Sequence, residues 1–359
     1  VAAMSGGVDS SVAAALLLEQ GYDVLGITLN VWPSEEVCPG GRTCCSQTDV
    51  DDARRVCAML GIPHYVLNMR DLFREKVIDY FVREYLAGAT PNPCIACNTY
   101  VKFGALLHKA HELGAEFIAS GHYAQLTRDE AEGRLCLRRS ADAAKDQTYV
   151  LYTLGQSQLA SLLLPCGGMT KAQVRLKAQE LGLPTFAKSE SQDICFIGAE
   201  GYKGFIRSYC ERYALPAPEP GPVVDQSGCV LGSHEGVFSF TIGQRKGLGK
   251  YTNHRSFVTG IDPAAATVTL GDEGALYSSA MLVGGMNAML PARLCDGAAA
   301  NVKIRYSAPE APVTVRLLAD GRLKVIFGTP QKAVTRGQAA VFYQGDLLLG
   351  GGTIEQAIP

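Results

Sequence analysis

Apolar segments alternate with amphipathic ones through the first half of the chain. The apolar runs are residues 1–4, 22–31 and 64–68, and the stretches with helical periodicity are residues 11–20, 47–60, 71–86 and 99–113. Gly21, Gly61 and Gly114 follow three of the helical stretches, where helices commonly end. The apolar run EFIASGHY then predicts a further strand. This alternation predicts parallel βαβ units in a doubly wound α/β sheet, with a ligand crevice at the carboxyl ends of the strands.

The second half of the chain has a different pattern of apolar and polar residues. After about residue 215 helical periodicity disappears, and short runs such as VFSFTIG and ATVTLGD are separated by Gly, Asp and Pro. From about residue 280 the runs NVKIRY, VTVRLL, LKVIFG and AAVFYQG follow at the spacing of a small β-barrel, with Gly321 and Gly345 at expected hairpin turns. We therefore expect an α/β domain over residues 1–205, a small mostly β domain over 206–278 and a C-terminal β-barrel over 279–359.

Composition and charge narrow the class of protein. With 359 residues, 47% hydrophobic and 19% charged, the chain suits a globular protein of two or three domains. No apolar run approaches the roughly 20 residues of a membrane span, and the first residues, VAAMSGG, lack the features of a signal peptide. We therefore expect a cytoplasmic protein without a membrane partner. The net charge of -2 argues against a globally basic surface, so a nucleic-acid partner has to be held by local patches.

A glycine-rich string stands between the first apolar run and the first helical stretch. Residues 4–10 read MSGGVDS, which places Ser5, Gly6 and Gly7 where backbone amides and the helix dipole can converge on an anion such as pyrophosphate. Asp9 can hold Mg²⁺ or fix the loop. For Gly-Gly alone, a turn followed by an N-cap is the alternative. The string is neither a Walker A loop nor a dinucleotide fingerprint.

The twelve cysteines suit thiol chemistry or metal binding better than a disulfide scaffold, because they are scattered through a large chain. Cys94 and Cys97 form a Cys-x-x-Cys pair in TPNPCIACN, on a proline-stiffened loop before a helix expected near Thr99, whose dipole would favour the Cys97 thiolate. Structural zinc is the main alternative, although no second pair completes a tetrahedral site. Cys195 lies in the motif SESQDICFIG.

Together these motifs resemble a known enzyme family. SGGVDS resembles the loop of the PP-loop ATP pyrophosphatase superfamily, of adenine nucleotide alpha hydrolase-like fold, whose members release pyrophosphate from ATP while adenylating a carbonyl oxygen. TPNPCIACNTYVKFG, ASGHY, KDQTYVLYTL, DICFIG, GQRKGLG and AVFYQGDLLLGGG extend the likeness over essentially the whole chain, which is similar to the tRNA-specific 2-thiouridylase family. The resemblance implies a sulfurtransferase that installs 2-thiouridine at the wobble position of tRNAs, those for Lys, Glu and Gln.

The same resemblance implies roles for particular residues. Cys97 takes the position of the nucleophile and Cys195 that of the persulfide carrier. The implied ATP-binding residues are Ala3, Met4, Ser5, Gly6, Gly7, Val8, Asp9, Ser10, Leu29 and Gly121. The residues implied to contact tRNA are Asn92, Pro93, Cys94, His122, Lys145, Asp146, Gln147, Arg305, Tyr306 and Gln344. Taken alone, each basic residue among them would be interpreted as a solvated surface charge.

The sulfur chemistry stays open at one position, because many family members have Asp where this chain has Cys94. In one interpretation Cys195 accepts sulfane sulfur from a donor protein, attacks the adenylated carbon, and Cys97 resolves the intermediate by forming a disulfide. In the other, Cys94, Cys97 and Cys195 ligate a 4Fe-4S cluster whose fourth iron binds sulfide. Three thiolates suit iron better than two thiolates and a carboxylate. ATP and Mg²⁺ are expected in both.

Two alternative functions and the role of one further cysteine pair remain to be considered. A tRNA 4-thiouridine synthetase is the nearest rival enzyme, although we see no RNA-binding extension before the phosphate loop. A non-catalytic iron-sulfur protein that binds RNA is the rival from another class. Cys44 and Cys45 are adjacent in GGRTCCSQTD, where a disulfide between neighbours would be strained, so we expect an inert loop pair.

Overall fold

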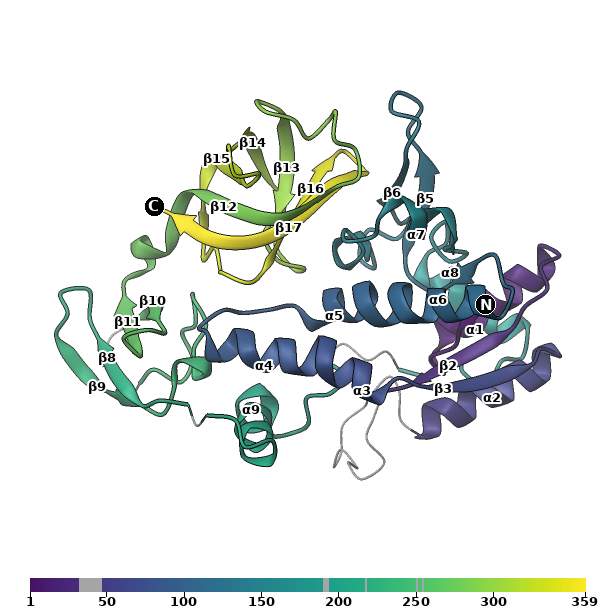
Figure 1. The fold of residues 1–359 in the computed structure, drawn as a ribbon, viewed down its shortest axis with the longest axis horizontal. Coiled ribbons are helices and arrows are strands. Elements are labelled where there is room, and N and C mark those ends of the chain that lie inside the picture. Colours follow the sequence, from purple (N-terminus) through teal and green to yellow (C-terminus); the bar gives the residue numbers. More distant parts are fainter. Residues whose placement is uncertain (32–46, 190–193, 217, 250, 254) are drawn as a thin grey trace. The chain divides into compact units, whose positions relative to one another are not determined.

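The computed structural model describes residues 1–31, 47–189, 194–216, 218–249, 251–253 and 255–359 (Figure 1). The chain divides into two compact units. The first comprises Val1–Ile78, Pro93–Ala199 and Asp346–Leu348, and the second comprises Asp79–Asn92, Glu200–Gly345 and Leu349–Pro359. None of the helices in the described ranges is both long and apolar enough to span a bilayer.

A five-stranded parallel sheet forms the centre of the first unit. Its order is β3-β2-β1-β4-β7, and its strands are β1 (Ala2–Ala3), β2 (Gly26–Asn30), β3 (His64–Asn68), β4 (Ile118–Ala119) and β7 (Leu162–Leu163). Because β1 has β2 on one side and β4 on the other, the order of connections reverses between β1 and β4. Ligands of open α/β sheets bind at the carboxyl ends of the strands at such a point. The predicted doubly wound sheet is therefore confirmed.

The helices of the first unit follow the apolar pattern of the sequence. They are α1 (Val8–Glu19), α2 (Gln47–Leu60), α3 (Arg70–Phe73), the π-helix η1 (Arg74–Ile78), α5 (Pro93–Ala96), the π-helix η2 (Cys97–Ala105), α6 (Leu106–Glu112), the short η3 (Thr148–Val150), α7 (Gln156–Ala160) and α8 (Lys171–Glu180). Helices α1, α2 and α8 share a core with β1, in which Val12, Ala53 and Val174 are fully buried. Gly21 and Gly61 end α1 and α2 with φ of +85° and +69°, as predicted.

One predicted helix begins earlier than expected. The helix predicted over residues 99–113 begins at Pro93 and runs through α5, η2 and α6 to Glu112. Proline suits the first position of a helix, because its missing N–H would have no acceptor there. The prediction that the cysteine pair lies on a loop before Thr99 is therefore wrong, since Cys94 and Cys97 lie on the helix itself.

In the described part of the second unit, helices α4 (Asp79–Leu86) and α9 (Gly201–Arg212) and a four-stranded sheet precede the barrel. The two helices meet through Phe81 and Phe205, whose ring centroids lie 6.4 Å apart. The sheet has the order β10-β11-β8-β9, with strands β8 (Gly221–Val224), β9 (Val230–His234), β10 (Phe257–Asp262) and β11 (Thr267–Gly271). The short helices η4 (Val237–Ser239) and η5 (Glu273–Leu276) complete this mostly β segment.

Six strands close the C-terminal barrel. Their order is β12-β15-β14-β13-β16-β17, and β17 pairs back to β12. The strands are β12 (Tyr277–Ala288), β13 (Ala299–Lys303), β14 (Ala311–Leu317), β15 (Leu323–Lys332), β16 (Ala339–Gln344) and β17 (Leu347–Ile358). Gly321 and Gly345 occupy the turns before β15 and β17 with φ of +83° and +61°. The predicted β-barrel and its turns are confirmed.

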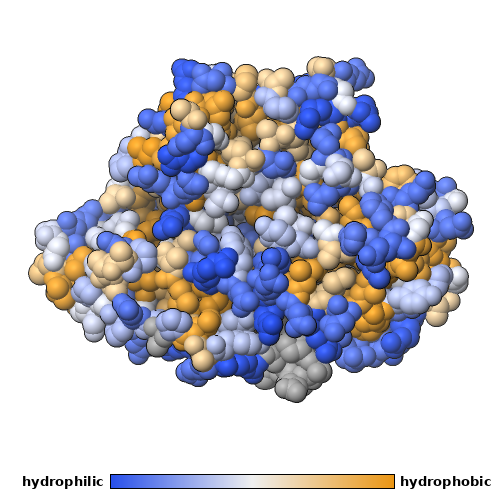
Figure 2. Space-filling view, in the orientation of Figure 1, coloured by the Kyte–Doolittle hydropathy of each residue, from blue (hydrophilic) through white to orange (hydrophobic). Residues whose placement is uncertain are grey.

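A hairpin completes the first unit. Strands β5 (Ala124–Arg128) and β6 (Leu135–Arg139) are antiparallel, and Leu347 pairs with Arg138 of β6. The Arg138 guanidinium lies 2.8 Å from the Asp346 carboxylate. On the visible face, hydrophilic residues form groups between hydrophobic ones (Figure 2), and the prediction that local patches hold a nucleic-acid partner stays a prediction.

Candidate functional site: a phosphate loop and two cysteine segments

The phosphate loop connects β1 to the amino end of α1. Gly6 has φ of +69°, and a Cβ atom on it would lie 2.2 Å from the carbonyl oxygen of Asp49 in α2, so glycine is required there. Gly7 is the N-cap of α1, and the amides of the first turn have no acceptor within the helix. The Ser10 hydroxyl donates to the Gly7 carbonyl at 3.1 Å and accepts from the Ser5 amide at 3.2 Å. The loop therefore presents donors at the positive end of a helix, which suits a pyrophosphate.

Two other predicted nucleotide-binding positions lie at the ends of neighbouring strands. Gly121 follows β4, and a Cβ atom there would lie 2.6 Å from the carbonyl carbon of Asp9, so its backbone packs directly on the first turn of α1. Leu29 is half-buried near the end of β2. The loop and Gly121 thus follow β1 and β4, and Leu29 lies near the end of β2, so all three belong to adjacent strands at the switch point of the sheet, where a ligand crevice is expected. Their contact with ATP stays a prediction.

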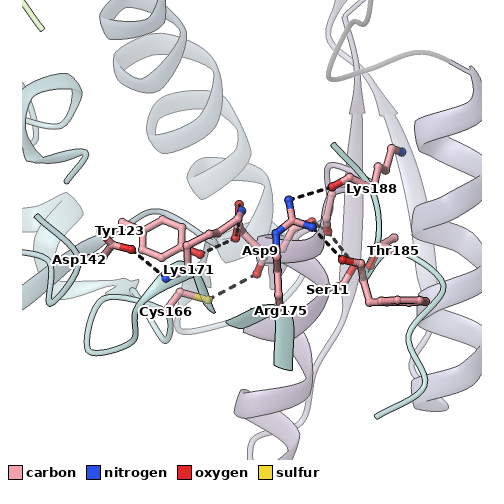
Figure 3. A network of polar contacts seen from close by, with 12 residues as sticks. Asp9, Ser11, Tyr123, Asp142, Cys166, Lys171, Arg175, Thr185 and Lys188 are labelled. Atoms are coloured by element: carbon pink, nitrogen blue, oxygen red, sulfur yellow. Dashed lines mark hydrogen bonds and ion pairs between the residues drawn. The ribbon is translucent and has the colours of Figure 1, made fainter. Parts of the chain in front are cut away.

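Two side chains from other segments hold the carboxylate of Asp9 (Figure 3). The Lys171 Nζ lies 2.7 and 2.8 Å from its two oxygens, and the Tyr123 hydroxyl donates to one of them at 2.6 Å. The Cys166 thiol donates to the Asp9 carbonyl at 3.5 Å. Burial, helped by the Asp9 charge, raises the pKa of Cys166 to about 12, so this thiol is inert. Two roles were open for Asp9 in the sequence, holding Mg²⁺ or fixing the loop. These contacts correspond to the second role.

A second lysine holds the loop through Gly6. The Lys188 Nζ donates to the Gly6 carbonyl at 2.9 Å and to the carboxylates of Asp49 and Asp52 at 2.7 and 2.6 Å. Burial alone would lower the pKa of Lys188, but the hydrogen bonds and charges of the two carboxylates outweigh it and raise the pKa. Arg175 donates to the Lys188 carbonyl at 3.2 Å and fixes its backbone (Figure 3). Lys188 therefore stays charged against the loop.

Sequence reasoning missed both lysines. One local signal exists, because Thr170 and Gln173 form a capping box that starts α8 at Lys171. Nothing in the pattern indicates that the Lys171 side chain reaches Asp9, 162 positions earlier. The same segment also bonds to α1 through the Thr185 hydroxyl, which donates to the Ser11 hydroxyl at 3.1 Å.

The cysteine pair lies in the first two turns of its helix. Pro93 is the first residue of α5, Cys94 is exposed, and Cys97 is half-buried at the start of η2. Because the helix begins at Pro93, the prediction that its dipole favours a Cys97 thiolate is wrong. The dipole acts mainly within the first turn, where Cys94 lies. A π-helical segment at Cys97 fits the frequent occurrence of such segments at functional sites.

Hydrogen bonds fix this helix to the segment KDQTYVLYTL. The buried Asn98 amide group donates to the Val150 carbonyl at 2.9 Å. The Thr99 hydroxyl lies 2.8 Å from the Ile95 carbonyl and 2.7 Å from the Thr153 hydroxyl. The turn that follows Cys97 is therefore rigid, and the backbone of the predicted nucleophile has a defined position.

The residue after Cys195 anchors the second cysteine segment. Phe196 is 1% exposed and packs edge-to-face on Phe73 of α3, with ring centroids 5.9 Å apart. Helix α3 in turn packs against η2, which begins with Cys97. Cys195 is a half-buried thiol in the same unit as Cys97. The segments that carry the two predicted catalytic cysteines thus meet one set of helices.

The predicted iron-sulfur site was tested against the same geometry. Within the ranges that the structure describes, no group of three His, Cys, Asp or Glu side chains is placed to hold a metal ion. Cys94, Cys97 and Cys195 are thus not part of such a group, and their ligation of a 4Fe-4S cluster stays a prediction. Cys44 and Cys45 lie outside the described residues.

His122, predicted to approach tRNA, lies between the phosphate loop and the cysteine helix. Its half-buried ring lies 5.6 Å from the ring of Phe103 in η2, and its Nδ1 is 2.9 Å from the Ser120 hydroxyl. Burial, followed by the positive charge of Lys102, holds the pKa of His122 well below its usual range. His122 is therefore neutral at neutral pH and can stack or form hydrogen bonds without adding charge.

The predicted tRNA-contact residues 145–147 lie in a loop with many internal bonds. The buried Asp146 carboxylate accepts from the Thr148 hydroxyl at 2.8 Å and lies 3.4 Å from Arg139. The Gln147 side chain accepts from the Tyr123 amide at 2.9 Å, and the Gln147 amide donates to the Tyr123 carbonyl at 2.9 Å. Asp146 thus shapes the loop from within, and the contact of these residues with RNA stays a prediction.

The remaining predicted tRNA contacts belong to the second unit. Asn92 is its half-buried residue directly before Pro93. Tyr306 is exposed, with the Lys303 Nζ 5.7 Å from its ring centroid, and Arg305 donates to two backbone carbonyls at 2.9 and 3.3 Å. The exposed Gln344 accepts from an arginine side chain at 3.1 Å. An exposed aromatic ring beside a cation suits stacking on an unpaired base.

Family models match most of the chain. Residues 1–199 match a model described as tRNA methyl transferase HUP domain, residues 207–272 one described as tRNA methyl transferase PRC-barrel domain, and residues 291–354 one described as Aminomethyltransferase beta-barrel domain. Their order agrees with the predicted α/β, small β and barrel segments. The predicted boundaries after residues 205 and 278 stay predictions, and α9 runs through position 205.

Named relatives match along nearly the full length. A protein of Pelotomaculum thermopropionicum named tRNA-specific 2-thiouridylase MnmA is 52% identical, with 99% of this chain and 96% of the relative covered. Its namesake from Moorella thermoacetica is 52% identical, with 98% of each chain covered. The solved U34-tRNA thiolase NcsA from Methanococcus maripaludis is 20% identical over 59% of this chain and 64% of its own, but its TM-score of 0.33 carries no weight for function. The resemblance found in the sequence is confirmed, and the chain belongs to the tRNA-specific 2-thiouridylase family.

Proposed function

We propose that the chain is an ATP-dependent tRNA 2-thiouridylase, a sulfurtransferase that replaces the C2 oxygen of a wobble uridine with sulfur. The observation that carries this proposal is the placement in one unit of a pyrophosphate-binding type of glycine loop and two cysteine segments that meet the same helices. An ATP site beside thiols suits the activation of a carbonyl followed by attack of sulfur. Relatives that bear this name at 52% identity support it.

The chemistry needs both parts, because the C2 carbonyl of uracil is a poor electrophile and its oxygen a poor leaving group. The C2 oxygen attacks the α-phosphorus of ATP, pyrophosphate leaves, and AMP stays on the oxygen. The terminal sulfur of a persulfide on Cys195 attacks C2, and AMP departs with the oxygen. The Cys97 thiolate then attacks the Cys195 sulfur, so that a Cys97–Cys195 disulfide forms and the terminal sulfur stays on C2. External thiols reduce the disulfide.

The residues divide between the two substrates. The amides and hydroxyls of the loop from Ala3 to Ser10 bind the phosphates, and Leu29 and Gly121 border the adenosine. Asn92, Pro93 and Cys94 border the target base, which leaves the anticodon stack at a cost of a few kcal/mol. The residues that meet the rest of the tRNA are His122, Lys145, Asp146, Gln147, Arg305, Tyr306 and Gln344.

No step is assigned to a metal. The resemblance implies Mg²⁺ with ATP and a 4Fe-4S cluster on Cys94, Cys97 and Cys195. In the described residues both oxygens of Asp9 face Lys171, and no three ligand-type side chains stand together. In this arrangement neither Mg²⁺ nor the cluster has a set of ligands among the described residues, so both stay predictions for measurement.

The partners and compartment follow from the same reaction. The RNA substrates are the tRNAs for Lys, Glu and Gln, and a donor protein supplies persulfide or sulfide. The described cysteines are thiols, which suits the reducing cytoplasm, where disulfides are rare. We therefore place the reaction there.

A single assay separates the rival functions. The purified protein is incubated with ATP, a sulfur donor and unmodified tRNA, and pyrophosphate and the modified nucleosides are measured. We expect pyrophosphate release that depends on tRNA, together with 2-thiouridine. A product of 4-thiouridine would favour the rival enzyme, and binding of tRNA without pyrophosphate release would favour the non-catalytic protein.

Anaerobic purification decides between the two sulfur routes. Iron and sulfide are measured, and the same preparation is then assayed for thiolation. Cys94→Asp removes one of the three thiolates. Full activity of this variant in protein free of iron would contradict an obligatory cluster, whereas activity that follows the iron content would contradict the persulfide route.

A further inference from the structure

A closed ring of hydrogen bonds joins the phosphate loop to the loop that carries residues 145–147, and its bonds at Asp9 and Asp142 are drawn in Figure 3. Asp9 accepts from the Tyr123 hydroxyl at 2.6 Å and from the Lys171 Nζ at 2.7 and 2.8 Å. The Tyr123 backbone exchanges two bonds of 2.9 Å with Gln147. The Lys171 amide donates to the Asp142 carboxylate at 2.9 Å, in the same loop as Gln147. Two connections, one through Tyr123 and one through Lys171, therefore lead from the loop of residues 142–147 to the Asp9 carboxylate, and we call them the two arms.

The loop between the two arms is stiff. The Asp142 carbonyl accepts from the Lys145 amide at 3.0 Å, and its Oδ1 accepts from the Ala144 amide at 3.1 Å. The Ser140 hydroxyl both donates to the Asp142 carbonyl at 2.8 Å and accepts from the Asp142 amide at 3.0 Å. Because these bonds tie the loop together, a contact that moves Lys145 moves the ends of both arms.

The ring is placed where it can change the affinity for an anion. Tyr123 is 3% exposed and Lys171 8% exposed, whereas the Asp9 side chain is 30% exposed, so their bonds to Asp9 are partly shielded from water and electrostatically strengthened. Asp9 is in the first turn of α1, beside the amides that face the pyrophosphate, where a second negative group would be repelled. The positions of the Tyr123 and Lys171 donors therefore set how much of the Asp9 charge an incoming phosphate meets.

We propose that Tyr123 is a positioning residue that couples tRNA contact at Lys145–Gln147 to ATP binding in the phosphate loop. Its hydroxyl holds Asp9, its backbone holds Gln147, and its ring is the rigid link between them. Contact with tRNA then tightens ATP binding, and by thermodynamic linkage ATP tightens tRNA binding by the same factor. The inference rests on the proposed function, since it needs tRNA and ATP to bind where that function places them.

Tyr123→Phe tests the coupling, because it removes the bond to Asp9 and keeps the ring. The dissociation constant of a non-hydrolysable ATP analogue is measured by calorimetry with and without unmodified tRNA, and that of tRNA with and without the analogue. In the wild type we expect each ligand to tighten the other on the order of ten-fold. In Tyr123→Phe we expect mutual tightening below about two-fold, so that the variant loses more affinity for the analogue in the presence of tRNA than in its absence. Tyr22→Phe removes the hydroxyl of a tyrosine that is not part of this hydrogen-bond network, and it should keep the full coupling.

A second variant on the other arm guards against a folding defect in the first. Asp142→Asn weakens the acceptor of the Lys171 amide and should lower the coupling in part. Full coupling in Tyr123→Phe, or an equal loss of analogue affinity with and without tRNA, would overturn the inference. A wild type that binds both ligands without mutual effect would overturn it and leave the proposed function standing. A wild type that binds neither would overturn both.

Discussion

The phosphate loop and the two cysteine segments belong to the same unit, but they differ in their contacts with distant segments and in their exposure to solvent. At the loop, Asp9 and Gly6 are each held by a lysine from a distant segment. At the cysteine segments, Cys94 is exposed and Cys97 and Cys195 are half-buried. Among the described residues no three ligand-type side chains gather around them. The difference teaches that side chains from distant segments fix the phosphate loop, whereas the three cysteines stay partly accessible to solvent.

Cys195→Ser should separate the two regions most strongly. A serine hydroxyl cannot carry a persulfide, so we expect sulfur incorporation into tRNA to fall by roughly 10³-fold or more. ATP affinity should stay within about two-fold, because the bonds described at Asp9 and Gly6 come from Tyr123, Lys171 and Lys188. Thiolated tRNA is measured by its retardation in an organomercury gel, and ATP affinity by calorimetry. Cys97→Ser should behave alike, and the exposed Cys229→Ser in the second unit serves as the control. Undiminished sulfur incorporation by either variant would refute the assignment.

Gly6→Ala should damage the other region and leave the cysteines intact. The added Cβ would lie 2.2 Å from the Asp49 carbonyl at a backbone φ of +69°. We expect ATP affinity to fall on the order of 100-fold, or about 2–3 kcal/mol. Alkylation of Cys97 and Cys195 should be unchanged. Gly133→Ala is a matched control, because Gly133 has φ of +64° but nothing within 4 Å of its Cβ position. Equal ATP affinity in the two variants would contradict the steric argument.

The two regions also differ in how much of each can be predicted from the sequence alone. The phosphate loop was predictable because its glycines, its N-cap and the preceding strand are neighbours in the chain, so a local pattern defines them. The barrel was predictable because period-2 alternation and turn glycines such as Gly321 and Gly345 are local as well. Lys171 and Lys188 were missed, because their partners Asp9 and Gly6 are 162 and 182 positions away.

The incorrect prediction that the cysteine pair lies on a loop has a similar cause. The motif TPNPC contains two prolines, and both were interpreted as loop residues. Pro93 instead begins a helix, where its fixed φ is favourable. A proline motif alone does not distinguish these two cases, since the choice depends on packing after the proline. Here Asn98 and Thr99 bond to Val150 and Thr153, residues far along the chain.

Lys188→Met measures how much the second lysine adds to preorganisation of the loop. The variant leaves the Asp49 and Asp52 carboxylates without their shared cation, and the Gly6 carbonyl without its donor. We expect ATP affinity to fall roughly ten-fold, about 1.4 kcal/mol. Lys188→Arg keeps the charge and should recover part of the loss. Lys177→Met in α8, where Lys177 pairs with Glu19 at 2.7 Å, should leave ATP affinity unchanged. Similar losses in Lys188→Met and Lys177→Met would show a general effect of removing a cation.

The smallest effect concerns His122, which lies between the two regions. Its pKa in the folded protein is well below 6.5 because of burial and the Lys102 charge, so the unfolded state takes up a proton first as the pH falls. The stability that the neutral ring contributes is therefore complete above about pH 6.5 and is lost below it. Between about pH 7.5 and 5.5, the wild type should lose roughly 2–4 °C more in its unfolding midpoint than His122→Asn. Comparing the change with pH cancels the constant loss of the contact with Phe103. His111→Asn, on the exposed face of α6, controls for the removal of an imidazole. An equal decline in wild type and His122→Asn would mean that His122 takes up its proton in the folded protein, and it would then offer RNA a charge that the present geometry denies it.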